Sequence, residues 1–174
     1  GWYLLSTILD DYSRYIITWR LTTTMAAADV TGTLEDALKA TGLSEARVKH
    51  KPRLLSDNGP CYISGELKDW LKKQDIEHTR GAPYHPQTQG KIERYHRSLK
   101  NVVKLEHYYY PWELEKAISE WVEHYNHERY HESLDNVTPA DVYDGRRNEI
   151  LDQRAVVKAR TMTKRKVHNL RLAG

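Results

Sequence analysis

Two acidic residues are placed so that each could present a carboxylate to a metal ion. Asp57 follows the apolar run "PRLLS" and precedes the turn sequence "NGP", which predicts an exposed carboxylate at the carboxyl end of a strand. Glu93 lies near the start of a basic helix, after the loop "GAPYHPQTQG". Carboxylates are ligands for hard divalent cations, so this pair could hold a cation against an anionic group. Two ordinary alternatives stay open, with Asp57 as a turn residue and Glu93 as a solvated partner of Arg97.

The helix around Glu93 carries a high density of positive charge. With 3.6 residues per turn, Arg97 (i+4) and Lys100 (i+7) fall on the same helix face as Glu93, and Gln89 lies one turn before it. Such a face could bring an anionic group to a cation that Glu93 holds. The basic residues of this stretch are Lys91, Arg94, Arg97 and Lys100.

A second metal-binding pattern occurs at residues 127–131, where "HERYH" matches H-E-x-x-H. In zinc peptidases the two histidines of this motif bind the metal from one helix face and the glutamate acts as the base. Here the stretch lies at the polar end of its expected helix, and no third ligand is obvious. A zinc site is therefore the weaker alternative.

The single cysteine, Cys61, could act as a nucleophile with His78 or His85. Nine histidines make such pairings frequent by chance, and the neighbourhood of Cys61 indicates no activated thiolate. We expect a packed or partly exposed structural cysteine. One cysteine also excludes an internal disulfide framework and is typical of a reducing cytoplasm.

Length and composition indicate one water-soluble domain, with room for an appendage. The chain has 174 residues, 39% of them hydrophobic, and a mean hydropathy of −0.78. No stretch approaches the roughly 20 apolar residues of a membrane span, and no signal-peptide pattern opens the sequence. The chain starts without Met at "GWYLLSTIL", as a fragment or a processed product does.

The net charge of +3 is unevenly distributed along the chain. Residues 146–174 contain nine Lys or Arg against two acidic residues (+7), whereas residues 1–145 contain 18 Lys or Arg against 22 acidic residues (−4). A basic extension on a mildly acidic body favours a polyanionic partner, most simply nucleic acid. A solvated charged helix and a disordered tail remain the alternatives for residues 146–174.

Strands alternate with helices after an opening hairpin, which predicts an α/β domain. "DDYS" is the turn between the hairpin strands. Asp29 is the expected N-cap of the first helix and Ser64 that of the second, while Pro111 suits the first turn of the last long helix. Strands are predicted near residues 1–9, 14–21, 52–57 and 76–80, and helices near residues 27–41, 64–74, 88–106 and from 111 onward.

Apolar residues at helical spacing predict which faces of the two long helices reach the core. On the helix near residues 88–106 they are Ile92, Tyr95, Leu99, Val102 and Val103. On the helix that begins at residue 111 they are Leu114, Ile118, Trp121, Val122 and Tyr125.

Three stretches together resemble the DDE integrase/transposase core of retroviral integrases and bacterial insertion-sequence transposases, most of all the IS3-type enzymes. They are "LLSDNGPCYIS", "PYHPQTQGKIERYHRSLK" and "YNHERYHESLDNVTPADVY". Between Asp57 and Glu93 lie 35 residues, and the resemblance covers residues 1–145. It implies a ribonuclease H-like fold, in which a mixed sheet is flanked by helices.

The resemblance also implies metal-dependent breaking and joining of DNA strands. Asp57 and Glu93 are then catalytic metal ligands for Mg²⁺, with Mn²⁺ able to substitute, while Arg97 and Lys100 contact phosphates and Gln89 approaches a base or sugar edge. The implied partners are DNA, as element ends and target, and further copies of the chain in a homo-multimer, with no membrane. The implied location is the bacterial cytoplasm, at the nucleoid when DNA is bound. The implied DNA-binding residues are Gln89, Lys91, Arg94, Arg97 and Lys100.

The resemblance is incomplete at one point. A DDE site has three carboxylates, and in the family the first Asp lies on a strand just before the segment that resembles "GWYLLSTILDDYSRY". No residue here takes that role, since Asp10 and Asp11 fall in the hairpin turn. We therefore expect a core that lacks its first, central strand and is weakly active or inactive alone. A DNA-binding or assembly module without catalysis is the main alternative, and residues 146–174 are expected to be a helical extension that contacts DNA or a partner subunit.

Overall fold

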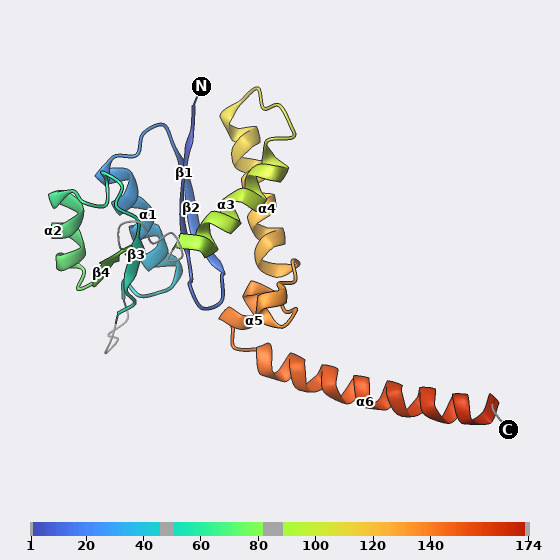
Figure 1. Cartoon of the computed structure of the whole chain (residues 1–174). Helices are drawn as coiled ribbons and strands as arrows, with labels where there is room; N and C mark the ends of the chain where they lie inside the picture. Colours follow the sequence, from blue (N-terminus) through green and yellow to red (C-terminus); the bar gives the residue numbers. More distant parts are fainter. Residues whose placement is uncertain (1, 46–50, 82–88, 173–174) are drawn as a thin grey trace.

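The computed structural model describes residues 2–45, 51–81 and 89–172 of the chain. A hairpin and a pair of parallel strands are flanked by helices, and one long helix projects from the body (Figure 1). In chain order the elements are β1 (Leu4–Leu9), β2 (Ile16–Thr22), α1 (Ala27–Ala40), β3 (Leu54–Ser56), α2 (Gly65–Lys73), β4 (His78–Arg80), α3 (Gly90–Val103), α4 (Pro111–His127), the short 3₁₀ helix η2 (Glu132–Leu134), α5 (Pro139–Tyr143) and α6 (Arg147–Leu172).

The predicted hairpin is confirmed, with β1 and β2 paired antiparallel from Leu4 opposite Thr22. Its turn is closed by Asp10, whose Oδ2 accepts hydrogen bonds from the N–H and the hydroxyl of Ser13 at 2.7 and 2.6 Å. Arg14 follows in a left-handed conformation with φ of 64°, which is uncommon for a residue with a side chain. The turn chemistry expected of this stretch is therefore present, and the carboxylate of Asp10 is used by it.

The strands form two separate sheets rather than one. β3 pairs with β4 in parallel, with Leu54 opposite His78, and β1 pairs with β2. The expectation of a single mixed sheet is therefore not met among the described residues, because no described strand lies between β1 and β3 to join the pairs. The α/β class and the flanking helices agree with expectation.

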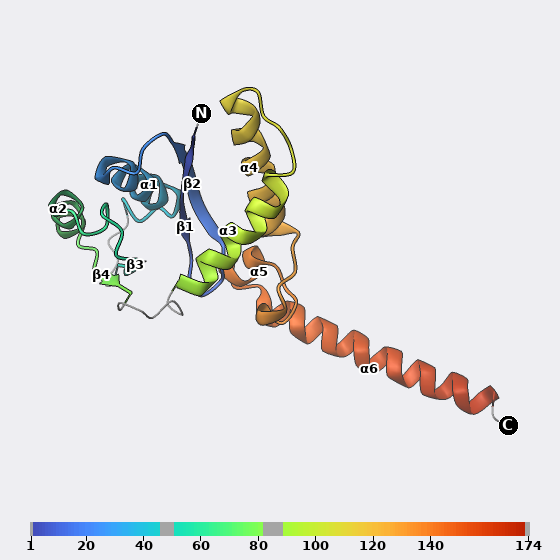
Figure 2. The same ribbon diagram turned by 45° about the horizontal axis from the view of Figure 1, so that its top comes forward.

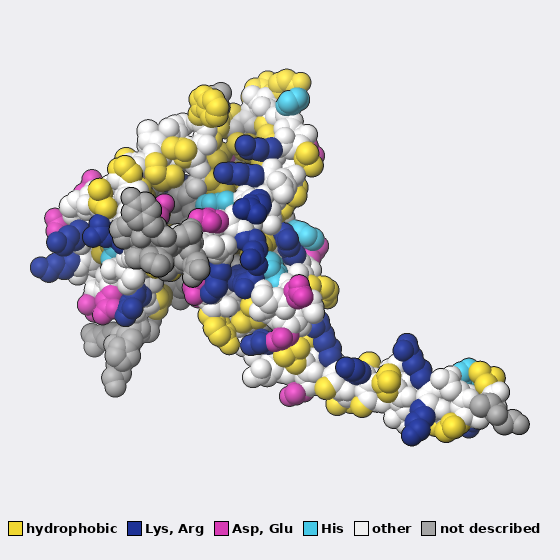
Figure 3. All heavy atoms as spheres, in the orientation of Figure 1, with side chains coloured by type: hydrophobic (Ala, Val, Ile, Leu, Met, Phe, Trp, Pro, Cys, Tyr) yellow, Lys and Arg dark blue, Asp and Glu magenta, His cyan; other side chains and the backbone are white. Residues whose placement is uncertain are grey.

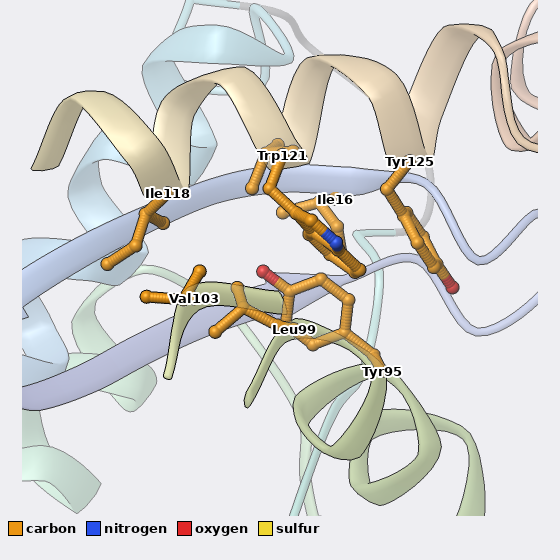
Figure 4. Close-up of a cluster of buried hydrophobic side chains, with 8 residues drawn as sticks. Ile16, Tyr95, Leu99, Val103, Ile118, Trp121 and Tyr125 are labelled. Atoms are coloured by element: carbon orange, nitrogen blue, oxygen red, sulfur yellow. The ribbon is translucent and has the colours of Figure 1, made fainter. Parts of the chain in front are cut away.

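The largest hydrophobic core lies where α3 and α4 meet each other and the hairpin (Figure 4). Tyr95 is 1% exposed, and its ring meets those of Trp121 and Tyr125 at centroid distances of 5.3 and 5.2 Å. Most of the predicted core positions on both helices are buried. The prediction for Val102 is wrong, since this residue is 52% exposed at the edge of the buried arc of α3 that runs from Tyr95 to Val103.

A second core lies on the other face of the hairpin, where α1 and α2 pack (Figure 1). Ile8 of β1 and Leu54 of β3 both border it, so this core links the two sheets in the absence of hydrogen bonds between them. Its buried residues are Val30, Leu34, Cys61, Leu67 and Leu71.

Most helix ends follow the local chemistry of the sequence. The hydroxyl of Ser64 caps α2 by accepting a backbone N–H bond at 3.2 Å, Pro111 opens α4, and Gly42 takes a φ of 69° just after α1. The N-cap of α1 was predicted wrongly, because the cap is Ala26. Asp29 lies in the first turn instead, where its carboxylate accepts a bond from the N–H of Ala26 at 3.0 Å.

Residues from Arg147 to Leu172 form α6, which projects from the body in both ribbon views (Figures 1 and 2). None of its residues is buried. Only its first turns pack on the body, where Ile150 and Leu151 contact a small cluster of Leu134, Val137 and Val142. Across the parts of the chain that the structure describes, no helix combines the length and the hydropathy needed to cross a membrane.

Candidate metal centre and nucleic-acid interface

Asp57 directly follows β3 and is exposed at the carboxyl end of that strand. Its Oδ1 accepts a hydrogen bond from the N–H of Gly59 at 2.8 Å, so the carboxylate shapes the "DNG" turn. No hydrogen bond from a described residue reaches Oδ2. The roles of turn residue and metal ligand are therefore compatible, because one oxygen shapes the turn and the other has no described partner.

The turn that carries Asp57 is fixed to the end of β4. The side-chain amide of Asn58 donates to the carbonyl oxygen of Gly81 at 2.8 Å, and the N–H of Gly81 donates to the carbonyl oxygen of Ser56 at 2.9 Å. The hydroxyl of Ser56 also lies 2.8 Å from Nε2 of His78. These bonds anchor the turn of Asp57 to Gly81, the first residue after β4.

Glu93 is exposed in the first turn of α3. Among the ion pairs between described residues, none includes its carboxylate. The ordinary alternative of an ion pair with Arg97 is therefore not formed. Its position at the positive end of the α3 dipole is compatible with either role.

The four basic residues of α3 divide between two flanks of the helix. Arg97 and Lys100 are exposed on the flank that also carries Glu93. Lys91 and Arg94 instead line a pocket on another flank. Lys and Arg side chains gather along the face of the molecule over α3 (Figure 3).

Gln89 occupies the N-cap position of α3 and is half-buried. Its Nε2 atom is buried and has no hydrogen-bond partner among the described residues. The loop residues 82–88 before it lie outside the described residues. The contact of Gln89 with a base or sugar edge stays a prediction.

The pocket also contains residues that the sequence did not indicate as functional. Arg14, Arg129 and His131 line it together with Lys91 and Arg94. Arg129 and His131 belong to the "YNHERYH" stretch, but no local signal places Arg14 beside them. The packing of the hairpin turn against the end of α4 brings these residues together.

Within residues 2–45, 51–81 and 89–172, no group of three or more His, Cys, Asp or Glu is placed to hold a metal ion. Asp10 is bonded within its turn, and Asp11 is paired with a lysine of α3 at 2.8 Å. Oδ2 of Asp57 and the carboxylate of Glu93 are exposed oxygens without described protein partners, and oxygens of this kind fit a hard cation. Carboxylates suit Mg²⁺ or Mn²⁺, and the role of Asp57 and Glu93 as two of the three expected ligands stays a prediction.

The zinc-peptidase alternative at residues 127–131 does not fit the structure. α4 ends at His127, and His131 lies beyond it in a β-bridge with Val137. The two histidines are therefore not on successive turns of one helix, as the motif requires. Burial, together with the charges of nearby arginines, lowers the pKa of His131 to about 4.

Cys61 does not have the environment of a nucleophile. It is 8% exposed in the second core, and burial raises the pKa of its thiol. The ring of His78 is engaged by a serine of β3, while His85 lies outside the described residues. The neighbouring Tyr62 is not activated either, because burial, with smaller effects of Cys61 and Asp57, raises its pKa to about 12.

Two curated relatives align with parts of the chain. It is 50% identical over 62 residues to the IgE-binding protein of Mus musculus, which covers 35% of this chain and 11% of the relative. It is 30% identical over 110 residues to the Gag-Pro-Pol polyprotein of mouse mammary tumor virus (strain BR6), which covers 61% of this chain and 6% of the relative. The chain thus spans only 6–11% of the length of these relatives.

Solved structures of retroviral integrases share the fold. The chain matches the catalytic core domain of BIV integrase with a TM-score of 0.60 and 23% identity, over 86% of this chain and 90% of that one. It matches the magnesium complex of the HTLV-2 integrase catalytic core domain, in its trimeric form, with a TM-score of 0.61 and 19% identity, over 80% and 83%. A chain of the simian T-cell lymphotropic virus intasome gives a TM-score of 0.67 and 22% identity, over 80% and 47%. The expected ribonuclease H-like fold class is therefore confirmed.

Two family descriptions match the sequence directly. Residues 1–86 match one that is described as the integrase core domain, and residues 74–139 match another with the same description. Together the matches run through both candidate ligands, Asp57 and Glu93. Residues 1–139 of the chain therefore match the integrase core domain.

Proposed function

We propose that this chain is the catalytic core of an enzyme that cleaves DNA strands and joins them to a target in a metal-dependent reaction. The integrase core homologues indicate a polynucleotidyl transferase of the DDE type. The proposal rests chiefly on one observation, that Asp57 and Glu93, inside the family match, are exposed, and that Oδ2 of Asp57 and the carboxylate of Glu93 have no hydrogen-bond or ion-pair partner among the described residues. Asp57 and Glu93 are the proposed ligands of Mg²⁺, with Mn²⁺ able to substitute.

Each residue has a distinct task in this proposal. Asp57 and Glu93 would hold the Mg²⁺, which would supply activation of the attacking oxygen and stabilisation of charge on the leaving oxygen. Asp57 is positioned for metal binding by the bond to Gly59 and by the anchoring of its turn to Gly81. Arg97 and Lys100 hold DNA phosphates beside Glu93, because the three share one flank of α3.

We also infer that one more strand completes the sheet. β1 and β3 each bond to only one described strand, so each presents a free edge, and the two pairs are separate. A strand between them would pair with both and could carry the third carboxylate, which no described residue supplies. The 174-residue chain is then weakly active or inactive alone.

The finer assignments follow from the resemblance of the quoted stretches. The chain is proposed to come from an IS3-type insertion-sequence transposase, which acts on element ends and target DNA as a homo-multimer in the bacterial cytoplasm, at the nucleoid. The trimeric form of one structural relative and the intasome of another support assembly on DNA, although those are properties of the relatives. Residues 146–174 are proposed as a basic extension that contacts DNA or a partner subunit, next to a core of residues 1–145.

Metal binding can be measured separately from catalysis. Mn²⁺ added to the 174-residue chain should broaden the amide NMR signals around Asp57 and Glu93, and Glu93→Gln should weaken this effect. Glu115→Gln, an exposed change on α4, is the matched control and should bind Mn²⁺ as the wild type does. Equal broadening in the wild type and in Glu93→Gln would contradict the assignment of Glu93.

Assays of DNA nicking and joining distinguish the proposed enzyme from a non-catalytic DNA-binding module. Mg²⁺-dependent nicking and joining of labelled duplex DNA should appear when the chain is produced with the additional strand and its Asp, and Glu93→Gln should abolish it while leaving DNA affinity unchanged. A DNA-binding module would bind the duplex and show no metal-dependent nicking in either form. Robust strand transfer by the 174-residue chain alone would contradict the proposal that this chain is weakly active or inactive by itself.

A further inference from the structure

A pocket of about 230 Å³ lies between the hairpin turn, α3 and the end of α4. It is smaller than typical small-molecule sites, which measure roughly 300–1,000 Å³, and its size suits a single small group. Three separate segments form its wall. The lining residues that carry charge or hydrogen-bonding groups are Arg14, Lys91, Arg94, Ser98, Arg129 and His131.

The pocket concentrates positive charge that the described residues do not neutralise. Arg14, Arg94 and Arg129 form no salt bridge with any described carboxylate, whereas Lys91 is paired with Asp11 at 2.8 Å. Three unpaired guanidinium groups around one small space repel one another, and an anion between them would relieve that repulsion.

The three arginines that line the pocket act electrostatically on the same two side chains of its wall. After burial, which is the largest cause, the charges of Arg129, Arg14 and Arg94 act to lower the pKa of His131. The same three arginines oppose the rise that burial causes in the pKa of Tyr125. Nε2 of His131 is buried and has no hydrogen-bond partner among the described residues.

The geometry of the wall is held by the fold. Arg14 keeps its left-handed conformation at the end of a turn that Asp10 and Ser13 close, so its guanidinium is carried on a restrained backbone. Next to the lining residue Tyr125, Asn126 of α4 bonds to both backbone groups of Ile16 at the start of β2. The hairpin and α4 are therefore locked together at this pocket.

The pocket is separate from the candidate metal centre. At about 100° per residue, Ser98 lies roughly 140° around the axis of α3 from Glu93. Lys91 and Arg94 flank Ser98 on the pocket side, whereas Arg97 and Lys100 stay with Glu93. A ligand in the pocket would therefore not touch the metal site.

We propose that this pocket binds one phosphate group of a DNA backbone, away from the metal centre, through Arg14, Arg94 and Arg129. Guanidinium groups suit this ligand because they present paired N–H donors that match two phosphate oxygens. The identity of the phosphate as DNA rests on the proposed function. The site would hold a second point of the bound DNA, on the far flank of α3 from the reacting phosphate.

Fluorescence anisotropy with a labelled 30-base-pair duplex, recorded over a series of salt concentrations, tests this inference on the 174-residue chain. The pocket variants are Arg129→Gln and Arg14→Gly, and the matched control is Arg53→Gln, an exposed arginine paired with Glu77 away from the pocket. Arg14→Gly suits the left-handed backbone, so it removes the charge without straining the turn. It therefore keeps the test valid if Arg129→Gln fails to fold, which circular dichroism would reveal.

Each pocket variant should weaken DNA binding about tenfold and lower the salt dependence of log K by about one unit of slope, whereas Arg53→Gln should match the wild type. DNA affinities equal to that of Arg53→Gln at every salt concentration would overturn the inference. If the wild type itself fails to bind DNA, the proposed function fails as well.

Inorganic phosphate distinguishes a site for a DNA phosphate from a site for free phosphate, since both ligands present the same phosphate oxygens. Millimolar phosphate should perturb the NMR signals of the pocket residues and should compete with the duplex for the wild type. Perturbation of these signals by phosphate, with unchanged DNA affinity in the pocket variants, would show a free-phosphate site and overturn the DNA assignment. If phosphate perturbs none of these signals and the pocket variants keep the DNA affinity of the wild type, the pocket is not an anion site.

Discussion

The side chain of Asn126 joins two parts of the chain that are 110 residues apart. Its Oδ1 accepts from the N–H of Ile16 at 2.9 Å, and its Nδ2 donates to the carbonyl oxygen of the same residue at 3.0 Å. Ile16 is 2% and Asn126 3% exposed, so water cannot easily replace either bond. The "YN" letters of the third quoted stretch are therefore structural, and they set the distance between the hairpin turn and the end of α4.

Replacing Asn126 by Ala should lower the free energy of unfolding by about 2–4 kcal/mol, because it leaves a buried N–H and a buried C=O without partners. Urea unfolding followed by circular dichroism measures this change. Asn148→Ala, an exposed change at the start of α6, is the control and should have an effect below about 1 kcal/mol. A similar stability for the two variants would show that water replaces the amide.

His131 should make the fold less stable in mild acid. The folded protein protonates this ring only near pH 4, whereas the unfolded chain does so near the ordinary pKa of 6.5. Between these values the unfolded state binds more protons, so stability falls as the pH drops from about 6.5 to about 4, by roughly 1–3 kcal/mol.

Unfolding measured at several pH values, in the wild type and in His131→Gln, would isolate this contribution. The variant should lose the corresponding part of the pH dependence, whereas the exposed change His107→Gln should keep the wild-type profile. An unchanged profile in His131→Gln would mean that other groups cause the acid sensitivity.

At the scale of elements, α3 and α6 differ in how firmly the rest of the fold holds their exposed side chains. One flank of α3 packs in the main core through Tyr95 and Leu99, so its exposed residues are held in place. α6 is anchored only at its start, where Arg147 pairs with Asp135 and the guanidinium of Arg154 donates to the carbonyl oxygen of Asn136 at 2.8 Å. Beyond these turns its apolar and basic side chains are exposed and free to meet a partner.

Deleting residues 156–174 should leave the melting temperature within about 2 °C of the wild type, because that part of α6 packs against nothing described. Deleting residues 147–174 should cost about 2–3 kcal/mol, since Ile150 and Leu151 then leave the small core cluster. Thermal unfolding distinguishes the two. Strong destabilisation by the shorter deletion would reveal contacts of the distal helix.

The shorter deletion also removes six Lys or Arg, at positions 158, 160, 164, 165, 166 and 171, and no acidic residue. If α6 contacts DNA, the deletion should weaken duplex binding and reduce its salt dependence. Unchanged DNA affinity, with a change in oligomeric state by light scattering, would instead assign α6 to a partner subunit.

At the scale of the whole molecule, the two sheets are held together by side chains alone. The second core bridges them through Ile8 and Leu54, while β1 and β3 present free edges. The integrase-like fold is nevertheless formed, as the match over 86% of the chain to the BIV catalytic core shows. A molecule joined in this way should gain stability from a strand that pairs with both edges.

Sequencing the coding DNA upstream of the codon for Gly1 would show whether such a strand, with its Asp, is encoded. A chain produced with it should unfold at a higher temperature and should protect the amides of β1 and β3 from hydrogen exchange. The same exchange at β1 and β3 in both forms would contradict the pairing of the additional strand between them.

Much of the local structure could be predicted from the sequence, because it depends on neighbouring residues. The hairpin turn, the cap at Ser64 and the proline at the start of α4 each follow from short-range chemistry. Asp57 and Glu93 could also be singled out, because the stretches around them resemble the integrase/transposase core. The N-cap of α1 was placed three residues too late, at Asp29 instead of Ala26, because the cap depends on where the preceding chain enters α1.

The sequence by itself therefore determined the elements, the family and the two candidate metal ligands. Only the tertiary structure decided that the strands form two sheets and that Lys91 and Arg94 leave the flank of Glu93 to join Arg14 and Arg129 in a pocket. The physical reason is the separation along the chain of the residues that determine each feature. Turns and caps are set within a few residues, whereas the convergence of arginines far apart in the chain depends on how the hairpin, α3 and α4 bury their apolar faces together.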